Sequence, residues 1–159
     1  MNTILVPLDG SSLAEQVLAY VRLLAPLVAA RVQLLRVGSD EDLARVLVHE
    51  KELAHELGEQ SSPGHASGEQ LRQLLRQRAE VDLAERAKEL RTAGIEVDVQ
   101  LRDGFAAEQI IALAEHDHVT LIAMATHGYS GLRRWALGSV ADKIIHASMV
   151  PLLVVRARE

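Results

Sequence analysis

Short apolar runs that are rich in strand-forming residues alternate with amphipathic helical stretches along the whole chain. Such runs predict strands at residues 3–8, 31–37, 95–101, 119–125 and 151–155. Strands that are separated by helices pair in parallel through right-handed crossovers, because a parallel pair needs a long connection. The alternation therefore predicts an α/β fold with a five-stranded parallel sheet and helices on both faces.

Helical spacing of apolar residues predicts helices near residues 14–25, 40–57, 69–93, 107–114 and 140–147. Ser11 or Ser12 is expected to cap the first helix, Pro26 to end or kink it, and Gly94 to follow the third. Residues 59–68, EQSSPGHASG, have the composition of a linker. We expect a single domain over 1–159 with a variable helical and loop excursion at about 38–70.

The composition excludes several classes of function. The formal charge of −5 disfavours a surface for nucleic acid, and the absence of cysteine excludes disulfides and thiolate chemistry. MNTILVPLDG lacks the basic region of a signal peptide, and no apolar run approaches the roughly 20 residues that span a bilayer. We therefore expect a cytoplasmic protein with no nucleic-acid or membrane partner.

Ligands of parallel sheets bind beyond the carboxyl ends of the strands, where the strand order reverses. The loops to search hold Asp9 and Gly10, then Val37 and Gly38, and then residues 126–137. Between Met124 and Ala141 the chain has no acidic side chain but has His127 and two arginines. Such a loop before a helix suits an anion, although its glycines could equally serve only to form turns.

The segment MATHGYSGLRRWALGSV resembles the nucleotide signature G-x2-G-x9-G-[S/T] of universal stress proteins, with Gly128, Gly138 and Ser139 in its last three positions. The stretches ILVPLDGSSLAEQVLAYVRLLA, GFAAEQIIALAEHDHVTLIAMATHG and ADKIIHASMVPLLVVR also resemble that family. The likeness covers the chain except for about residues 38–70. It implies an adenine nucleotide alpha-hydrolase-like, Rossmann-like fold.

The resemblance implies that ATP is bound together with Mg²⁺ or Mn²⁺. Pro7 and Asp9 would lie beside the nucleoside, Val37 and Met124 would line the adenine slot, and the final glycine, serine and valine would face the phosphates. The binding residues it implies are Pro7, Asp9, Val37, Met124, Ala125, His127, Gly128, Gly131, Gly138, Ser139 and Val140. It also implies a homodimer that pairs through the C-terminal strand, and a regulatory role with a protein partner that the sequence does not identify.

One position departs from the family pattern. Ala125 stands where the signature has its first glycine. Its methyl group would cost about 1 kcal/mol or more if the backbone there had a positive φ, and little if the backbone were extended. This departure leaves open a nucleotide-free dimeric interaction module of the same fold.

The residues also allow two enzymatic or metal-binding hypotheses. A hydrolase or nucleotidyl transferase could use Asp9 and His127, but no water-orienting acid or glutamine can be assigned, so we expect any ATP hydrolysis to be slow. His116 and His118 flank Asp117 as metal ligands could, but a helix C-terminus favours the same residues. We expect neither a catalytic residue nor a protein-held metal.

Overall fold

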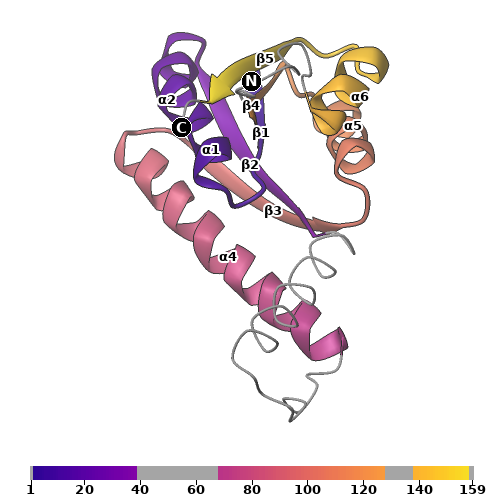
Figure 1. Ribbon diagram of the computed structural model, residues 1–159. Coiled ribbons are helices and arrows are strands. Elements are labelled where there is room, and N and C mark those ends of the chain that lie inside the picture. The colour runs from indigo at the N-terminus through magenta and orange to yellow at the C-terminus, as the bar shows by residue number, and fades with distance from the viewer. Residues whose placement is uncertain (1, 39–67, 128–137, 158–159) are drawn as a thin grey trace.

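A five-stranded, wholly parallel sheet forms the centre of the protein (Figure 1). The computed structural model describes residues 2–38, 68–127 and 138–157. The strands are β1 (Asn2–Pro7), β2 (Ala30–Gly38), β3 (Val97–Asp103), β4 (Leu121–His127) and β5 (Leu152–Ala157). Their order in the sheet is β3-β2-β1-β4-β5, which confirms the predicted α/β fold.

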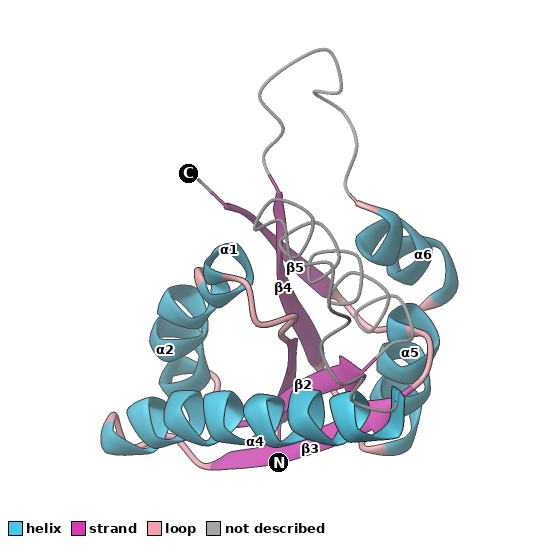
Figure 2. Ribbon diagram, turned by 60° about the horizontal axis from the view of Figure 1, so that its bottom comes forward, coloured by secondary structure: helices cyan, strands magenta, loops and turns pink. Residues whose placement is uncertain are grey.

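Helices cover both faces of this sheet (Figure 2). They are α1 (Ser12–Glu15), α2 (Val17–Leu27), α4 (Gly68–Thr92), α5 (Ala106–His116) and α6 (Ser139–Ala147). Helices α1, α2 and α4 lie on one face, and α5 and α6 lie on the other. The predicted helix at 40–57 and most of the predicted linker lie outside the described residues.

Each face of the sheet has its own apolar core, because successive side chains of a strand point to opposite faces. The first core lies under α2 and α4 and consists of Ile4, Val6, Leu8, Val17, Leu18, Val21, Ala25, Ala30, Val32, Leu34, Leu83, Ala87, Leu90, Ile95, Val97, Ala123 and Val155. The second core lies under α5 and α6 and consists of Leu5, Leu35, Ala107, Ile110, Leu113, Ala114, Val119, Ile122, Met124, Ala141 and Ile144.

The first predicted helix is two helices in the structure. Helix α1 ends after one turn, and α2 begins one residue beyond Gln16. Ser11 caps α1, since its Oγ accepts from the Ala14 amide at 3.1 Å. Pro26 lies inside the last turn of α2, which ends at Leu27, so the helix stops one residue after the proline.

Strand β3 departs in part from its predicted pattern. Ile95 and Val97 are buried, as the alternation predicts, but Val99 on the same face is 36% exposed. Among the strands that the structure describes, β3 lies at the edge of the sheet and has a neighbour on one side only. An apolar alternation therefore overestimates burial at this position.

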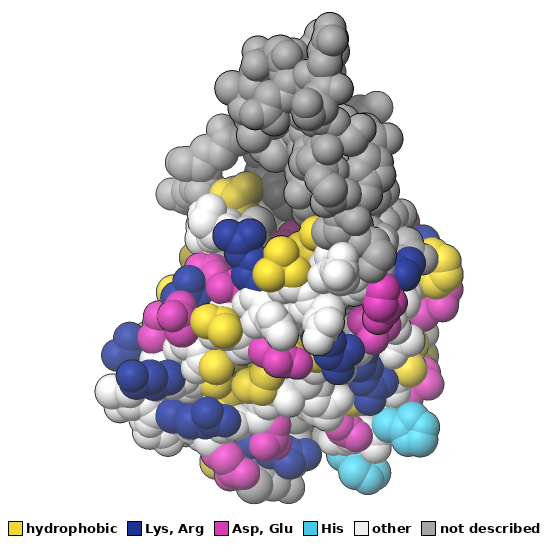
Figure 3. Space-filling model, turned by 90° about the horizontal axis from the view of Figure 1, so that it is seen from below, with side chains coloured by type: hydrophobic (Ala, Val, Ile, Leu, Met, Phe, Trp, Pro, Cys, Tyr) yellow, Lys and Arg dark blue, Asp and Glu magenta, His cyan; other side chains and the backbone are white. Residues whose placement is uncertain are grey.

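Charged side chains of both signs are interspersed on the surface seen in Figure 3. Along α4, Arg72 pairs with Glu69, Arg76 with Glu80, and Arg86 with Glu89. In the described part of the chain, no helix combines the length and the apolar character needed to cross a membrane.

Candidate functional site

The strand order reverses between β1 and β4. On one side of β1 the sheet continues with β2 and β3, and on the other side it continues with β4 and β5. The register between β1 and β4 has only two residue pairs, Ile4 with Leu121 and Leu5 with Ile122. Beyond them the carboxyl-terminal ends of both strands pair only with their outer neighbours, β2 and β5. This is the switch point at which parallel sheets bind ligands.

The loop after β1 is held by its own polar groups. The Leu8 amide donates to the Leu35 carbonyl at 2.8 Å, which keeps the start of the loop beside β2. Asp9 Oδ1 accepts from the Ser11 amide at 2.9 Å and from Ser11 Oγ at 2.6 Å. Gly10 between them has a φ of +81°, which favours glycine. The exposed Asp9 side chain thus has one oxygen fixed in the turn, while Oδ2 has no hydrogen bond within the described part of the chain.

Ala125 has an extended backbone within β4. Among the described residues other than glycine, a positive φ occurs only at Ala29 and His118. The Ala125 methyl group packs against the first core, whereas Met124 belongs to the second core. The alanine therefore causes no backbone strain, and its methyl group points to the opposite face of the sheet from Met124.

The second core continues to the carboxyl edge of the sheet. Val37 and Val140 are partly buried and pack against it, on the same side as Met124. Met124 itself is 8% exposed. Three apolar side chains from β2, β4 and α6 thus share one face at this edge.

Helix α6 begins without a side-chain cap. Its N-cap is Gly138, with a φ of +87°, and within the described part of the chain no side chain forms a cap hydrogen bond there. Ser139 is the first helical residue and is exposed, so its hydroxyl lies in the first turn of α6 and not at the N-cap. The amides of the first turn of a helix lack internal acceptors, and the helix dipole adds about half a positive charge there. This end of α6 therefore suits a negatively charged oxygen.

The structure gives a location to most of the predicted binding residues. Pro7 and His127 end β1 and β4, and the others that it describes lie at the same carboxyl edge or at the start of α6. Gly128 and Gly131 lie outside the described residues, as does the arginine-containing part of the predicted loop. The described residues of the segments that the sequence singled out, far apart in the chain, thus lie at one edge of the sheet.

Three charged residues behind the Asp9 loop were missed by the sequence analysis. The Arg36 guanidinium lies against Gly10. Arg86 of α4 donates to Glu15 of α1 at 2.9 Å, and this hydrogen bond raises the pKa of the Arg86 guanidinium. A signal for Arg36 was present, since the alternation of β2 puts it on the same face as Val32 and Leu34, where an arginine is unusual.

Asp117 has a structural role at the end of α5. The helix ends at His116, as predicted, and Asp117 Oδ2 accepts from the buried Gln33 at 2.9 Å and from Gln100 at 3.4 Å. These bonds tie the end of α5 to β2 and β3. Within residues 2–38, 68–127 and 138–157, no group of three His, Asp or Glu side chains could hold a metal ion.

The described geometry has counterparts among known proteins. The model of the universal stress protein family matches residues 1–156. Universal stress protein MJ0577 of Methanocaldococcus jannaschii is 31% identical over 155 residues, which cover 98% of this chain and 94% of that protein. A solved structure of MJ0577 aligns with a TM-score of 0.72 at 30% identity and covers 99% of this chain and 97% of its own.

Other relatives match over less of their length or at lower identity. Universal stress protein MJ0531 of the same organism is 33% identical over 94 residues, so the match spans 59% of this chain and 55% of that protein. A universal stress protein in complex with cAMP shares the fold with a TM-score of 0.60 at 15% identity, covering 99% of this chain and 98% of its own. One from Archaeoglobus fulgidus in complex with dAMP does so with a TM-score of 0.59 at 18% identity, covering 97% and 96%. The chain described here belongs to the universal stress protein family.

Proposed function

We propose that this chain is an ATP-binding regulatory protein that acts as a homodimer in a cytoplasmic stress response. The observation that carries the proposal is the uncapped start of α6 at the carboxyl edge where β1 and β4 part. Free amides and a helix dipole at a switch point are the usual means by which an α/β sheet binds nucleotide phosphates.

The residues at this edge suit the separate parts of a nucleotide. Val37 and Met124 provide apolar surface for an adenine ring, and the free Asp9 oxygen can accept from ribose or adenine. Ser139 and the first amides of α6, including that of Val140, are donors for phosphate oxygens. Pro7 would lie beside the nucleoside, and His127, Gly128, Gly131 and Gly138 would belong to the phosphate side.

The position of Ala125 argues against the alternative of a nucleotide-free module, which depended on this residue. Because its methyl group packs against the first core, it does not fill the side of the sheet that carries Val37 and Met124. Solved family members in complex with cAMP and dAMP further support an adenine nucleotide as the ligand. A divalent cation would be shared among the phosphate oxygens, since a triphosphate needs charge neutralisation that few side chains here supply.

Native mass spectrometry of the purified protein, followed by calorimetric titration with Mg-ATP, tests the proposal. We expect an adenine nucleotide to co-purify or Mg-ATP to bind with one site per chain. We also expect bound nucleotide to raise the unfolding temperature, because a ligand that binds only the folded state stabilises it. A protein that carries no nucleotide and shows neither heat of binding nor a thermal shift would contradict the proposal.

Ser139→Ala is expected to weaken Mg-ATP binding about fivefold, the effect of losing one hydrogen bond of about 1 kcal/mol. The unfolding temperature of the free protein should not fall, since Ser139 is exposed and does not cap α6. Ser148→Ala, at the other end of the same helix, is the control and should leave the affinity unchanged. Equal affinities of wild type and Ser139→Ala would remove Ser139 from the site.

The proposed dimer would form through β5, which is an edge strand that pairs on one side only among the described strands. Leu152, Leu153 and Val154 are only partly buried. We expect a dimer in size-exclusion chromatography with light scattering at micromolar concentration, and a monomer for Val154→Arg. Val81→Arg, on the exposed side of α4, should remain dimeric. A monomeric wild type would contradict this part of the proposal.

A further inference from the structure

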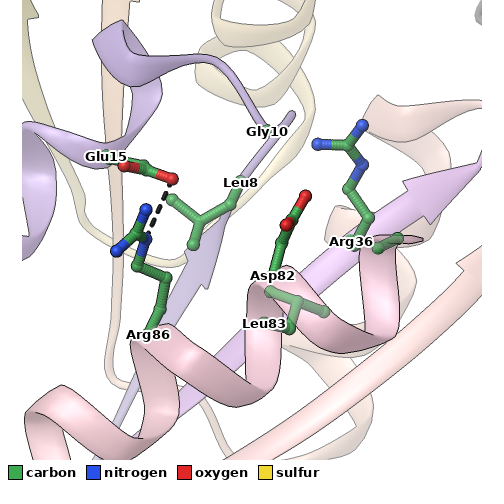
Figure 4. Close-up of a pocket in the computed structure, with 8 residues that line it drawn as sticks. Leu8, Gly10, Glu15, Arg36, Asp82, Leu83 and Arg86 are labelled. Atoms are coloured by element: carbon green, nitrogen blue, oxygen red, sulfur yellow. Dashed lines mark hydrogen bonds and ion pairs between the residues drawn. The ribbon is translucent and has the colours of Figure 1, made fainter. Parts of the chain in front are cut away.

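We propose that Arg36 is a positioning residue for the Asp9 loop, acting together with the Glu15–Arg86 ion pair, and that it sets the affinity for nucleotide without contacting it. The inference rests on the proposed function, because the ligand of the loop is the proposed nucleotide. Figure 4 shows the three side chains behind the loop, on the side that faces α4.

Arg36 packs directly on the backbone of the loop. If Gly10 carried a Cβ, that atom would lie 3.0 Å from Arg36 Cζ and 3.1 Å from Nη2, and closer still to Nη1. The guanidinium therefore occupies the space beside the Gly10 Cα. The hydrogen bond from Leu8 to the Leu35 carbonyl keeps the loop beside β2 up to the residue before Arg36. The loop thus rests on β2 by one hydrogen bond and one packed side chain.

The other support of the loop comes from α4. Arg86 Nε lies 2.9 Å from Glu15 Oε1, and both side chains are less than one-third exposed, at 29% and 27%. Arg86 Nη1 also lies 2.8 Å from Glu89 of its own helix. This half-buried pair fixes the end of α1, and therefore the far end of the segment that begins at Asp9. Loss of either support would release one end of the turn.

The space between these supports is too small for a ligand. The cavity lined by Leu8, Gly10, Arg36, Asp82, Leu83 and Arg86 has a volume of about 10 Å³, which is the room of about one water molecule. Arg36 and Arg86 approach it from opposite sides, and the carboxylate of Asp82 points into it between them (Figure 4). Arg36 and Arg86 therefore affect the loop through its packing and through the ion pair with Glu15, and not by binding a ligand in this cavity.

Arg36 also differs from Arg86 in its charge balance. Arg86 is paired with two carboxylates, whereas Arg36 forms no ion pair with any residue that the structure describes. Its guanidinium lies against Gly10, the residue that follows Asp9 in the loop. A cation there attracts the Asp9 carboxylate. Arg36 thereby favours the loop conformation in which Asp9 stays at the carboxyl edge.

A double-mutant cycle tests the role. Arg36→Met retains an unbranched stem but loses the charge and the planar fork, and we expect it to weaken Mg-ATP binding about tenfold, within the range of coupled neighbouring residues. In an Asp9→Ala background the same change should cost almost nothing further, because Arg36 acts through Asp9. Arg36→Lys should recover part of the affinity. Arg31→Met, at the opposite end of β2, is the control and should leave the affinity unchanged.

Hydrogen exchange of the nucleotide-free proteins tests the loop itself. We expect the amides of residues 8–11 to exchange faster in Arg36→Met than in wild type, with unchanged exchange in the core of β2. A wild type that binds Mg-ATP no more tightly than Arg36→Met overturns the positioning role and leaves the proposed function intact. Additive losses in the cycle overturn it too. If the wild type binds no nucleotide, the proposed function fails. Equal exchange rates at residues 8–11 in the wild type and Arg36→Met would overturn the support of the loop by Arg36.

Discussion

Asp9→Asn is expected to weaken Mg-ATP binding tenfold or more while leaving the stability of the free protein nearly unchanged. The asparagine oxygen can still accept from the Ser11 amide and hydroxyl, as Asp9 Oδ1 does at 2.9 and 2.6 Å. The second oxygen becomes an amide donor, so it can no longer accept from ribose or adenine. Losing a hydrogen bond to a charged group costs about 1.5–3 kcal/mol, which corresponds to about ten- to more than a hundredfold in affinity.

Two further variants separate the functions of this carboxylate. Asp9→Ala removes the Ser11 bonds as well, and it should lower both the affinity and the unfolding temperature. Asp98→Asn changes an exposed aspartate of β3 that pairs with Arg31, and it should leave nucleotide binding unchanged. Calorimetric titration and thermal unfolding of all three variants give both quantities. Asp9→Asn with wild-type affinity would exclude Asp9 from the nucleoside contact.

Ile144→Ala is expected to lower the free energy of unfolding by about 2–5 kcal/mol, because it leaves a cavity in a packed core. Ile144 is fully buried in the second core and fixes α6 on the sheet. Such a loss is a large part of the total stability of about 5–15 kcal/mol of a domain. Urea titration monitored by circular dichroism measures it, and the milder Ile144→Val, expected at about 0.5–1.5 kcal/mol, covers the case in which the alanine variant does not fold.

The neighbouring residue provides a matched control. Ile145 belongs to the same helix but is 44% exposed, and Ile145→Ala should change the stability by less than about 1 kcal/mol. Equal losses at the two positions would contradict the described orientation of α6. Since that orientation aims the uncapped helix end at the carboxyl edge, the comparison also tests the geometry on which the proposed phosphate site depends.

The sequence was sufficient to predict the sheet and its layers. Strands 3–8 and 119–125 were identified from continuous apolar runs, because a central parallel strand is buried on both faces and shows no alternation. The last helix was identified from the 3.6-residue spacing of its apolar side chains, and Ser11 from its cap chemistry. The break at Gln16 was not predicted, because apolar residues continue on one side of the chain across it.

The candidate site could be located in part from the sequence. The signature and the parallel topology identified the edge and the residues that lie along it, since both depend on local pattern and strand direction. The sequence could not decide whether the Ala125 methyl group would obstruct a ligand, because the residue type does not show whether that methyl group faces the ligand or the core. The extended backbone of β4 and the alternation of its side chains decided it.

What the sequence by itself determined was therefore the five strands and their parallel connection through helices, which follow from periodicity and composition within short segments. Only the tertiary structure decided that Ala125 faces the first core, that Gly138 rather than a side chain caps α6, and that Arg36 lies under Gly10. The physical reason is that a local pattern shows only that alternate side chains of a strand face opposite ways. Which core or loop each side chain meets, and the backbone conformation at Gly138, are set when segments far apart in the chain pack together.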